Sequence, residues 1–206
     1  MLKILEISAL LLRRMERGKM NHNYNAFHQA ELKYGENDRM TNITFKMDGG
    51  YFLHKAGAII IHDNHVLMVK NENFPYYYTV GGRVNLGETS EDAVMREVLE
   101  ETGVRLEIER LAFVHENLFT GSIFGAKDEL FHEVAFYYLM KPSDKIKKFK
   151  CTSVGADGGA ETLHWLPIAE LSNYDLFPDF YKTELSHLEK GVGHFITTKG
   201  RTIRRK

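Results

Sequence analysis

Three glutamates, Glu97, Glu100 and Glu101, have the spacing of neighbours on one side of an α-helix. At about 100° per residue, their carboxylates fall within an arc of roughly 100°. Carboxylates three and four positions apart repel one another and destabilise a helix, and near a helix C-terminus the macrodipole disfavours them further. Such a cluster needs a cation, and hard oxygen ligands favour Mg²⁺ or Mn²⁺. The spacing therefore predicts a divalent-metal site.

Two neighbouring residues suit the same interpretation. Ala93 lies one turn before Glu97 and is small, which would leave room for a metal-bound ligand. Arg96 borders the cluster and can fix a carboxylate through a charge-assisted hydrogen bond. An isolated run of acidic residues is most often a solvated helix surface. The segments on either side therefore decide between the two interpretations.

A glycine-rich loop and a capped helix must position these side chains. The loop has three glycines within residues 81–87, and Thr89 with Asp92 three positions later predicts a helix start. Gly103 predicts the end of that helix. The apolar residues are expected to lie on the side of the helix away from the glutamates and to pack on a sheet. They are Val94, Met95, Val98 and Leu99.

The whole segment resembles the signature sequence of the Nudix hydrolases. That signature has a glycine, a glutamate, an Arg-Glu pair with two further glutamates, and a closing glycine followed by an aliphatic residue. Every defined position is matched, by Gly82, Glu88, Arg96, Glu97, Val98, Glu100, Glu101, Gly103 and Val104. The run Trp165–Leu171 is similar to a segment common late in these domains.

The resemblance implies a fold and an activity. The expected fold is of the α/β class, an α/β/α sandwich with a central mixed β-sheet, in which the signature forms a loop–helix–loop. Members hydrolyse nucleoside diphosphates linked to another group, using Mg²⁺ or Mn²⁺. The expected partner is therefore a small nucleotide-type substrate, attacked at phosphorus by a metal-activated water.

The same resemblance assigns roles to residues of the signature. Glu97 and Glu101 are the principal metal ligands, and Glu100 assists directly or through water. The carbonyl group of Gly81 or Gly82 is expected to complete the coordination.

Two further residues of the signature are expected to support these ligands. Arg96 orients Glu97, and Glu88 supports the loop and the helix. The catalytic group would thus contain Glu97, Arg96 and Glu100, together with a general base.

The general base can be a glutamate of the signature or one from elsewhere in the chain. Outside the signature our candidate is Glu133, with Glu129 and Glu116 as alternatives. An ordinary outward-facing strand residue explains Glu133 equally well. His115 and His132 also lie in strand-like segments, where a lone histidine is more often structural than catalytic.

Three residues are candidates for contact with the substrate. Tyr76 and Tyr78 alternate onto one face of a strand and could stack on a base, although aromatic strand residues more often belong to a core. Arg83, next to the loop, could contact phosphate. Sequence markers of the ADP-ribose, dinucleoside polyphosphate and NADH subgroups are mostly absent, so the substrate stays open.

The character of the sequence changes near residue 40. Residues 1–39 open with an apolar segment, whereas strand signals become dense from Thr41 onward. We expect residues 1–39 to be an N-terminal extension or to lie upstream of the true start, with Met20 and Met40 as alternative starts. Residues 40–206 are expected to form the Nudix domain. The apolar segment could instead cover a homodimer interface.

Composition excludes several classes of protein. The chain has 206 residues with 27 basic and 28 acidic side chains, so no global field favours nucleic acid or an anionic membrane. The single cysteine, Cys151, excludes an intrachain disulfide. The uncharged stretch Ile7–Leu12 is too short to span a bilayer. We therefore expect a cytoplasmic protein with no membrane partner.

Two alternatives to a hydrolase of small nucleotides stay open. One is a catalytically silent Nudix module that binds a nucleotide as a regulator, but loss of signature residues marks that class and none is lost here. The other is a hydrolase of capped RNA ends, suggested by five basic residues within Lys199–Lys206. A terminal basic run is more often a solvated tail, and the overall charge gives nucleic acid no support.

Overall fold

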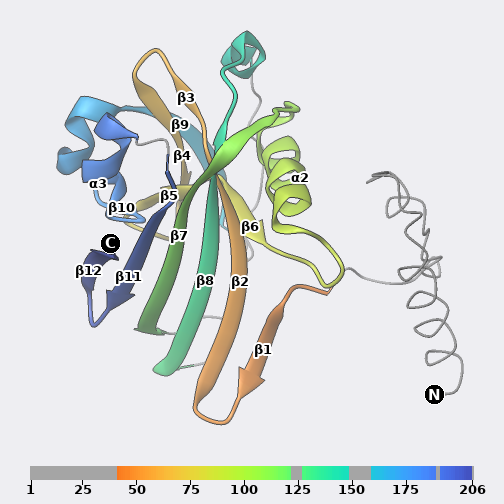
Figure 1. Ribbon diagram of the computed structural model, residues 1–206, viewed down its shortest axis with the longest axis vertical. Helices are drawn as coiled ribbons and strands as arrows, with labels where there is room; N and C mark the ends of the chain where they lie inside the picture. Colours follow the sequence, from red (N-terminus) through yellow and green to blue (C-terminus); the bar gives the residue numbers. More distant parts are fainter. Residues whose placement is uncertain (1–40, 122–126, 149–158, 189–190, 206) are drawn as a thin grey trace, which may run out of the picture. The chain divides into compact units, whose positions relative to one another are not determined.

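The computed structural model describes residues 41–121, 127–148, 159–188 and 191–205, with only the backbone given for 147–148 (Figure 1). The expectations for residues 1–39, Met40 and Cys151 lie outside these ranges. Among the helices in these ranges, none is long and apolar enough to cross a membrane.

The larger of two β-sheets has seven strands in the described residues, in the order β1-β2-β8-β7-β11-β12 with β6 beside β2. β1 and β6 pair with different parts of the same β2 edge. β2 pairs with β8 in parallel and β7 with β8 antiparallel, so the sheet is mixed. The strands are β1 (Thr44–Met47), β2 (Gly50–Ile59), β6 (Gly81–Arg83), β7 (Ile108–Gly121), β8 (Glu129–Met140), β11 (Gly193–Thr198) and β12 (Arg201–Arg205).

The smaller sheet has the order β10-β5-β4-β3, with β9 also paired to β4. Its strands are β3 (Ile61–His62), β4 (His65–Asn71), β5 (Tyr77–Thr79), β9 (Glu161–Pro167) and β10 (Leu176–Phe177). The helices are α2 (Ser90–Thr102) and α3 (Tyr181–Glu184), with the 3₁₀ turns η2 (Asp144–Lys148), η3 (Ile168–Asn173) and η4 (Leu185–His187).

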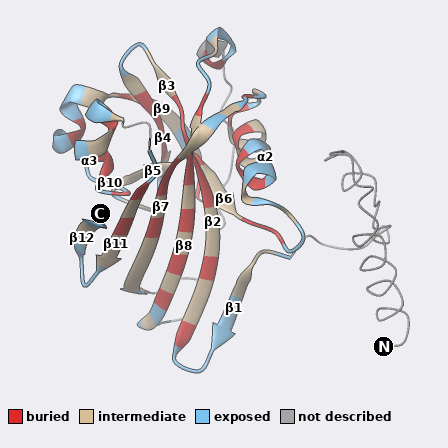
Figure 2. Cartoon of the chain, in the orientation of Figure 1, coloured by how far each residue is buried: buried red, intermediate tan, exposed pale blue. Residues whose placement is uncertain are grey.

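Two hydrophobic cores lie on opposite faces of the sheets, because successive side chains of a strand point to opposite faces. Ala58 of β2 and Tyr138 of β8 belong to the core that α2 covers. Their neighbours in the chain, Ile59 of β2 and Tyr137 of β8, point to the other face and belong to the core covered by η3, α3 and η4. Figures 1 and 2 show α2 and α3 on opposite sides of the strands, with buried residues along them. The predicted α/β/α sandwich is confirmed, with two sheets forming its central layer.

The basic run at the end of the described chain is not a tail. Arg201–Arg205 forms β12 and pairs antiparallel with β11. Arg204 lies 3.4 Å from Glu184 and places its guanidinium over the ring of Phe195. Part of the positive charge that suggested RNA binding is thus used within the fold.

Candidate active site

Helix α2 has the capped ends that its sequence predicts. The Thr89 hydroxyl accepts a hydrogen bond from the Asp92 backbone N–H at 3.1 Å and donates to the Asp92 carboxylate at 2.6 Å. At the other end Gly103 has φ 71°, and its N–H donates to the Leu99 carbonyl at 2.9 Å. Glycine adopts this left-handed conformation at little cost. The caps fix where the helical glutamates project.

The glutamates lie within the buried side of α2 rather than opposite it. Ala93, Val94 and Val98 have no exposed surface. At about 100° per residue, Glu97 and Glu101 project between these three residues. Both carboxylates therefore leave the helix toward the sheets.

This arrangement overturns part of the predicted packing. Met95 was expected to pack on the sheet but is 38% exposed, and Leu99 is only partly buried. Ala93 packs in the core and does not open space for a ligand. The physical reason is that the helix buries the arc centred on its glutamates, which turns Met95 and Leu99 toward solvent.

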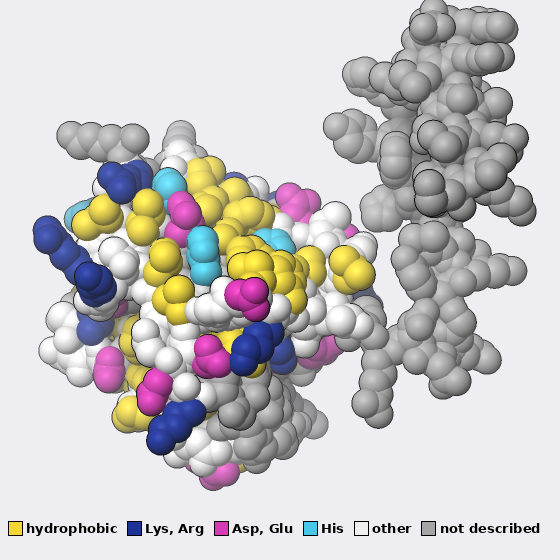
Figure 3. Space-filling view, turned by 90° about the horizontal axis from the view of Figure 1, so that it is seen from below, with side chains coloured by type: hydrophobic (Ala, Val, Ile, Leu, Met, Phe, Trp, Pro, Cys, Tyr) yellow, Lys and Arg dark blue, Asp and Glu magenta, His cyan; other side chains and the backbone are white. Residues whose placement is uncertain are grey.

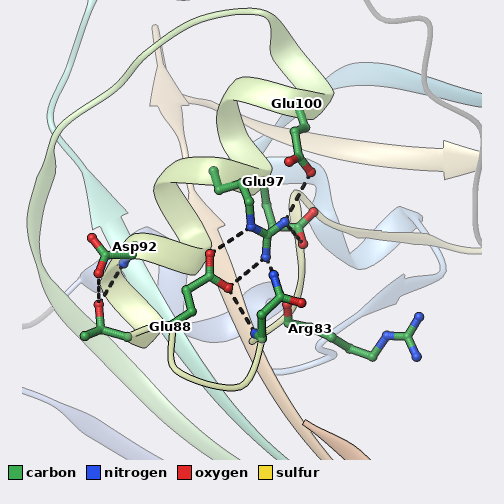
Figure 4. A network of polar contacts seen from close by, with 8 residues as sticks. Arg83, Glu88, Asp92, Glu97 and Glu100 are labelled. Carbon is green, nitrogen blue, oxygen red and sulfur yellow. Dashed lines mark hydrogen bonds and ion pairs between the residues drawn. The ribbon is translucent and has the colours of Figure 1, made fainter. Parts of the chain in front are cut away.

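Arg96, in the middle of α2, is the centre of a polar network that joins the helix to the loop before it. Figure 4 shows three of its partners, Glu88, Glu97 and Glu100. Its Nε and Nη2 atoms donate to the two carboxylate oxygens of Glu88, at 2.8 and 3.0 Å. Its Nη1 donates to Glu97 at 2.7 Å and to Glu100 at 3.2 Å, and Nη2 also reaches the Arg83 carbonyl at 3.1 Å. The rigid fork of a guanidinium suits this two-point contact. Arg96 therefore ties the loop to the helix and fixes Glu97.

Glu88 is held in its ionised form. Burial alone would raise the pKa of its carboxyl, but hydrogen bonds from Arg96 and from the Asn85 backbone N–H, at 3.0 Å, outweigh burial and lower it. The hydrogen bond to Glu88 in turn raises the pKa of Arg96. The predicted supporting role of Glu88 thus has a geometric basis.

Glu97 and Glu101 carry buried charge that the protein compensates only in part. Burial raises the pKa of Glu97 in spite of the hydrogen bond from Arg96. Burial raises the pKa of Glu101 well above its ordinary value, opposed by the Gly81 N–H, which donates to its Oε1 atom at 3.2 Å. The Oε2 atom of Glu101 is buried and has no hydrogen-bond partner among the described residues.

The two glycines of the loop are required by close contacts. A Cβ atom on Gly82 would lie against the carboxylate of Glu97. Gly81 has φ 138°, and a Cβ atom there would meet the Ala56 carbonyl oxygen. The loop thus approaches α2 and β2 more closely than residues with side chains would allow.

The donor set fits a hard divalent cation. Carboxylates are the ligands that Mg²⁺ and Mn²⁺ prefer, and the unpartnered Oε2 atom of Glu101 needs a positive partner. Within the described ranges, no three acidic, histidine or cysteine side chains converge in a ready-made metal site. One oxygen of Glu97 and one of Glu100 are instead hydrogen-bonded to Arg96.

Glu133 lies apart from the Arg96 network. It is 8% exposed on β8, and its nearest basic group is Lys55 on β2, at 3.7 Å. The charge of Lys55 also acts on Glu101. Glu133 is therefore a buried charged residue rather than an ordinary outward-facing one. The alternatives have other partners: Glu129 forms an ion pair with Lys46, and Glu116 lies 2.7 Å from the His194 Nε2 atom.

His115 ends a directed chain of hydrogen bonds, which we call the threonine chain. Thr202 donates to the Asp179 carboxylate at 2.8 Å, so Thr197 must donate to Thr202, at 2.7 Å. The Thr197 oxygen is then an acceptor, and the His115 Nε2 atom at 2.8 Å must carry the proton. Burial lowers the pKa of His115. The other histidine of interest, His132, contacts the Phe52 ring edge-on.

The residues expected to bind substrate lie in different surroundings. The Tyr76 ring stacks on Phe74 and meets Phe177 edge-on, at 5.4 and 4.9 Å. Tyr78 instead uses its hydroxyl, which donates to Glu161. The Arg83 side chain extends away from the Arg96 network (Figure 4).

The space-filling view from below shows charged and histidine side chains beside hydrophobic ones (Figure 3).

Two residues near the site were missed by sequence reasoning. Lys55 stands in a β-rich run and Glu161 opens a short strand, so neither has a local signal of function. Both come near the site only through strand pairing, because Lys55 lies opposite Arg83 and Glu161 lies opposite Asn71.

The chain is similar to several known proteins. The NUDIX domain family model matches residues 53–186. A MutT-like protein of Streptomyces ambofaciens is 29% identical over 138 residues, covering 67% of this chain and 77% of its own. An ADP-ribose pyrophosphatase of Methanocaldococcus jannaschii is 40% identical over 72 residues, covering 32% of this chain and 43% of its own. The crystal structure of a MutT protein from Bacillus halodurans has a TM-score of 0.49 at 18% identity, covering 71% of this chain and 91% of its own.

The family match extends over more than half of the chain and includes the whole Arg96 network. The chain therefore belongs to the Nudix family, as its signature sequence predicts.

Proposed function

We propose that this chain is a divalent-metal-dependent pyrophosphohydrolase that cleaves a nucleoside diphosphate linked to another group. The observation that carries the proposal is the buried Glu101 carboxylate, which has one oxygen unpartnered among the described residues and lies close to Glu97. Glu97, Glu101 and Glu100, with the Gly81 carbonyl, would hold Mg²⁺ or Mn²⁺. The ion would neutralise the pyrophosphate and lower the pKa of a bound water.

The chain's own residues position the reacting groups. Arg96 fixes the Glu97 carboxylate at 2.7 Å, and Gly82 lets that carboxylate lie against the loop backbone. Glu88 holds Arg96 in turn. A misplaced carboxylate costs rate even when the fold is intact, so these contacts are part of the catalytic machinery.

Basic and aromatic side chains support a nucleotide as substrate. Arg83 and Lys55 are cross-strand neighbours, so both extend from one face and suit contact with phosphates. Tyr76 belongs to an aromatic cluster in which Phe177 is 50% exposed, which suits stacking on a base. The names of the relatives, a MutT-like protein and an ADP-ribose pyrophosphatase, support the same substrate class.

Glu133 stays our candidate for the general base among the residues named from sequence. Its burial and its ion pair with Lys55, at 3.7 Å, support this choice. We also propose a cytoplasmic location and a homodimer, both of which rest on sequence alone.

A hydrolysis panel with Mg²⁺ tests the proposal. It contains nucleoside triphosphates, oxidised nucleotides, ADP-ribose, nucleotide sugars, dinucleoside polyphosphates and a capped RNA. Hydrolysis of one class, abolished in Glu101→Gln, would establish the activity and identify the substrate. Silence across the panel, with Mn²⁺ still bound, would favour the regulatory binding module instead.

A further inference from the structure

Three strands of the smaller sheet place polar side chains beside Glu101. Asn71 of β4 lies opposite Glu161 of β9, and Tyr78 of β5 lies opposite Val69 of β4. Because Val69 and Asn71 are two positions apart, all of these side chains share one face of the sheet. Val69 and Tyr78 pack in the core beneath α2, so this is the face toward the helix.

Hydrogen bonds fix the direction of this group. The Asn71 side-chain carbonyl accepts from the Asn73 backbone N–H at 2.8 Å, which leaves the Asn71 amide nitrogen for the Tyr78 oxygen. The Tyr78 hydroxyl then donates its only hydrogen to the Glu161 carboxylate, at 2.5 Å. Tyr78 therefore acts as a donor that holds Glu161.

Close packing keeps the group in place. Asn71 is 1% exposed, which prevents water from competing for its hydrogen bonds. A Cβ atom on Gly159 would lie against the side chains of Asn71 and Asn73. The short segment before β9 thus closes over the group, as only glycine permits.

The group lies within electrostatic reach of the candidate metal ligands. The negative charge of Glu161 acts on Glu101, and that of Glu101 acts on Tyr78. Glu161, on β9 of the smaller sheet, thus adds a carboxylate to those of helix α2. We do not count Glu161 among the direct ligands, because its Oε1 atom already accepts a hydrogen bond from the Tyr78 hydroxyl at 2.5 Å.

We propose that Glu161, held by the Tyr78 hydroxyl, is a positioning residue for the divalent cation and acts through water rather than by direct coordination. The inference rests on the proposed function. It assigns Tyr78 to the metal side of the site instead of to base stacking. Mutation of a residue that supports a metal site without direct coordination commonly lowers metal affinity by about 10–100-fold.

Mn²⁺ binding by the full chain, measured by calorimetry with the metal alone, tests the inference. Glu161→Gln keeps an acceptor for Tyr78 and removes the charge, and we expect its Mn²⁺ affinity to fall about tenfold. Tyr78→Phe keeps the ring and is expected to lose about threefold. Glu161→Asp keeps the charge and should recover part of the affinity. Glu170→Gln, an exposed glutamate on η3, is the matched control and should bind like the parent protein.

The outcomes separate the inference from the proposed function. Unchanged Mn²⁺ affinity in Glu161→Gln, with weakened binding in Glu101→Gln, would overturn the inference alone. A loss in Glu161→Gln but not in Tyr78→Phe would overturn the holding role of the tyrosine. Absence of Mn²⁺ binding by the parent protein would overturn both. A purely structural Glu161 would change the urea midpoint in EDTA and leave the Mn²⁺ affinity unchanged.

Discussion

Replacing Glu101 by glutamine should stabilise the metal-free protein while abolishing its activity. Glutamine has nearly the same shape, and its side-chain oxygen can still accept from the Gly81 N–H. The substitution removes a buried charge whose second oxygen has no partner among the described residues. The protein thus carries an electrostatic cost in the absence of metal.

The magnitude follows from the burial of Glu101. An unsatisfied buried polar group costs about 1–3 kcal/mol, and a charged one costs more. Glutamine leaves its own amide nitrogen in the same place, so the expected gain in unfolding free energy is the difference, about 1–2 kcal/mol at neutral pH.

The gain should depend on pH in a defined direction. Burial raises the pKa of Glu101 in the folded state well above its ordinary value of 4.5. The folded protein then binds this proton more tightly than the unfolded chain, so the cost is absent below the unfolded pKa. The cost develops as pH rises through the unfolded pKa and is complete above the folded one. The advantage of glutamine should therefore be small in acid and largest at neutral pH.

Urea unfolding in EDTA, followed by the fluorescence of the single tryptophan, Trp165, measures this gain at about pH 4 and about pH 7. Glu100→Gln is the matched control, because its side chain is 57% exposed on the same helix, and its effect should stay within about 0.5 kcal/mol. Added Mg²⁺ should raise the midpoint of the parent protein by mass action and leave that of Glu101→Gln unchanged. A less stable Glu101→Gln in EDTA at neutral pH, or an equal Mg²⁺ shift in both proteins, would refute the reasoning.

Three further predictions concern the same region. Arg96→Met should lower the unfolding free energy by about 3–5 kcal/mol in urea, whereas Lys46→Met, which breaks an exposed ion pair of similar length, should give no resolvable change. An equal loss in both would contradict the central role of the arginine. Gly82→Ala should reduce kcat about a hundredfold in steady-state assays by displacing Glu97, and normal turnover would show that the close contact is dispensable. The threonine chain requires the Nε2–H tautomer of His115, which ¹⁵N NMR of the imidazole rings can verify; an Nδ1–H tautomer would disprove the assigned direction of the chain.

The parts of the site that depend on local sequence were predictable. Thr89 and Gly103 define the ends of α2 through hydrogen bonds to residues at most four positions away. Arg96 and Glu88 are eight positions apart, within one loop and one helix. Fixed spacing over such short distances determines the geometry, so the signature sequence located the network.

The parts that depend on distant strands were not predictable. Tyr78 and Glu161 are 83 positions apart and meet only through the pairing of β4 with β5 and β9. Lys55 reaches Glu133 in the same way, through the parallel pairing of β2 with β8. A single sequence gives strand positions but not strand order, so alternation alone could not show that the Tyr78 hydroxyl meets Glu161.

The misassigned face of α2 shows where sequence patterns conflict at a functional site. Hydrophobic periodicity assumes that charged residues face water, and on that assumption Met95 and Leu99 belonged to the core. The helix instead turns Glu97 and Glu101, both partly buried, to the same side as the fully buried Val98. Natural sequences break such local rules mainly where function requires it. Inward-facing carboxylates cost stability when no cation is bound. Their position on the core side of α2, which made the packing prediction wrong, therefore supports a functional role for Glu97 and Glu101.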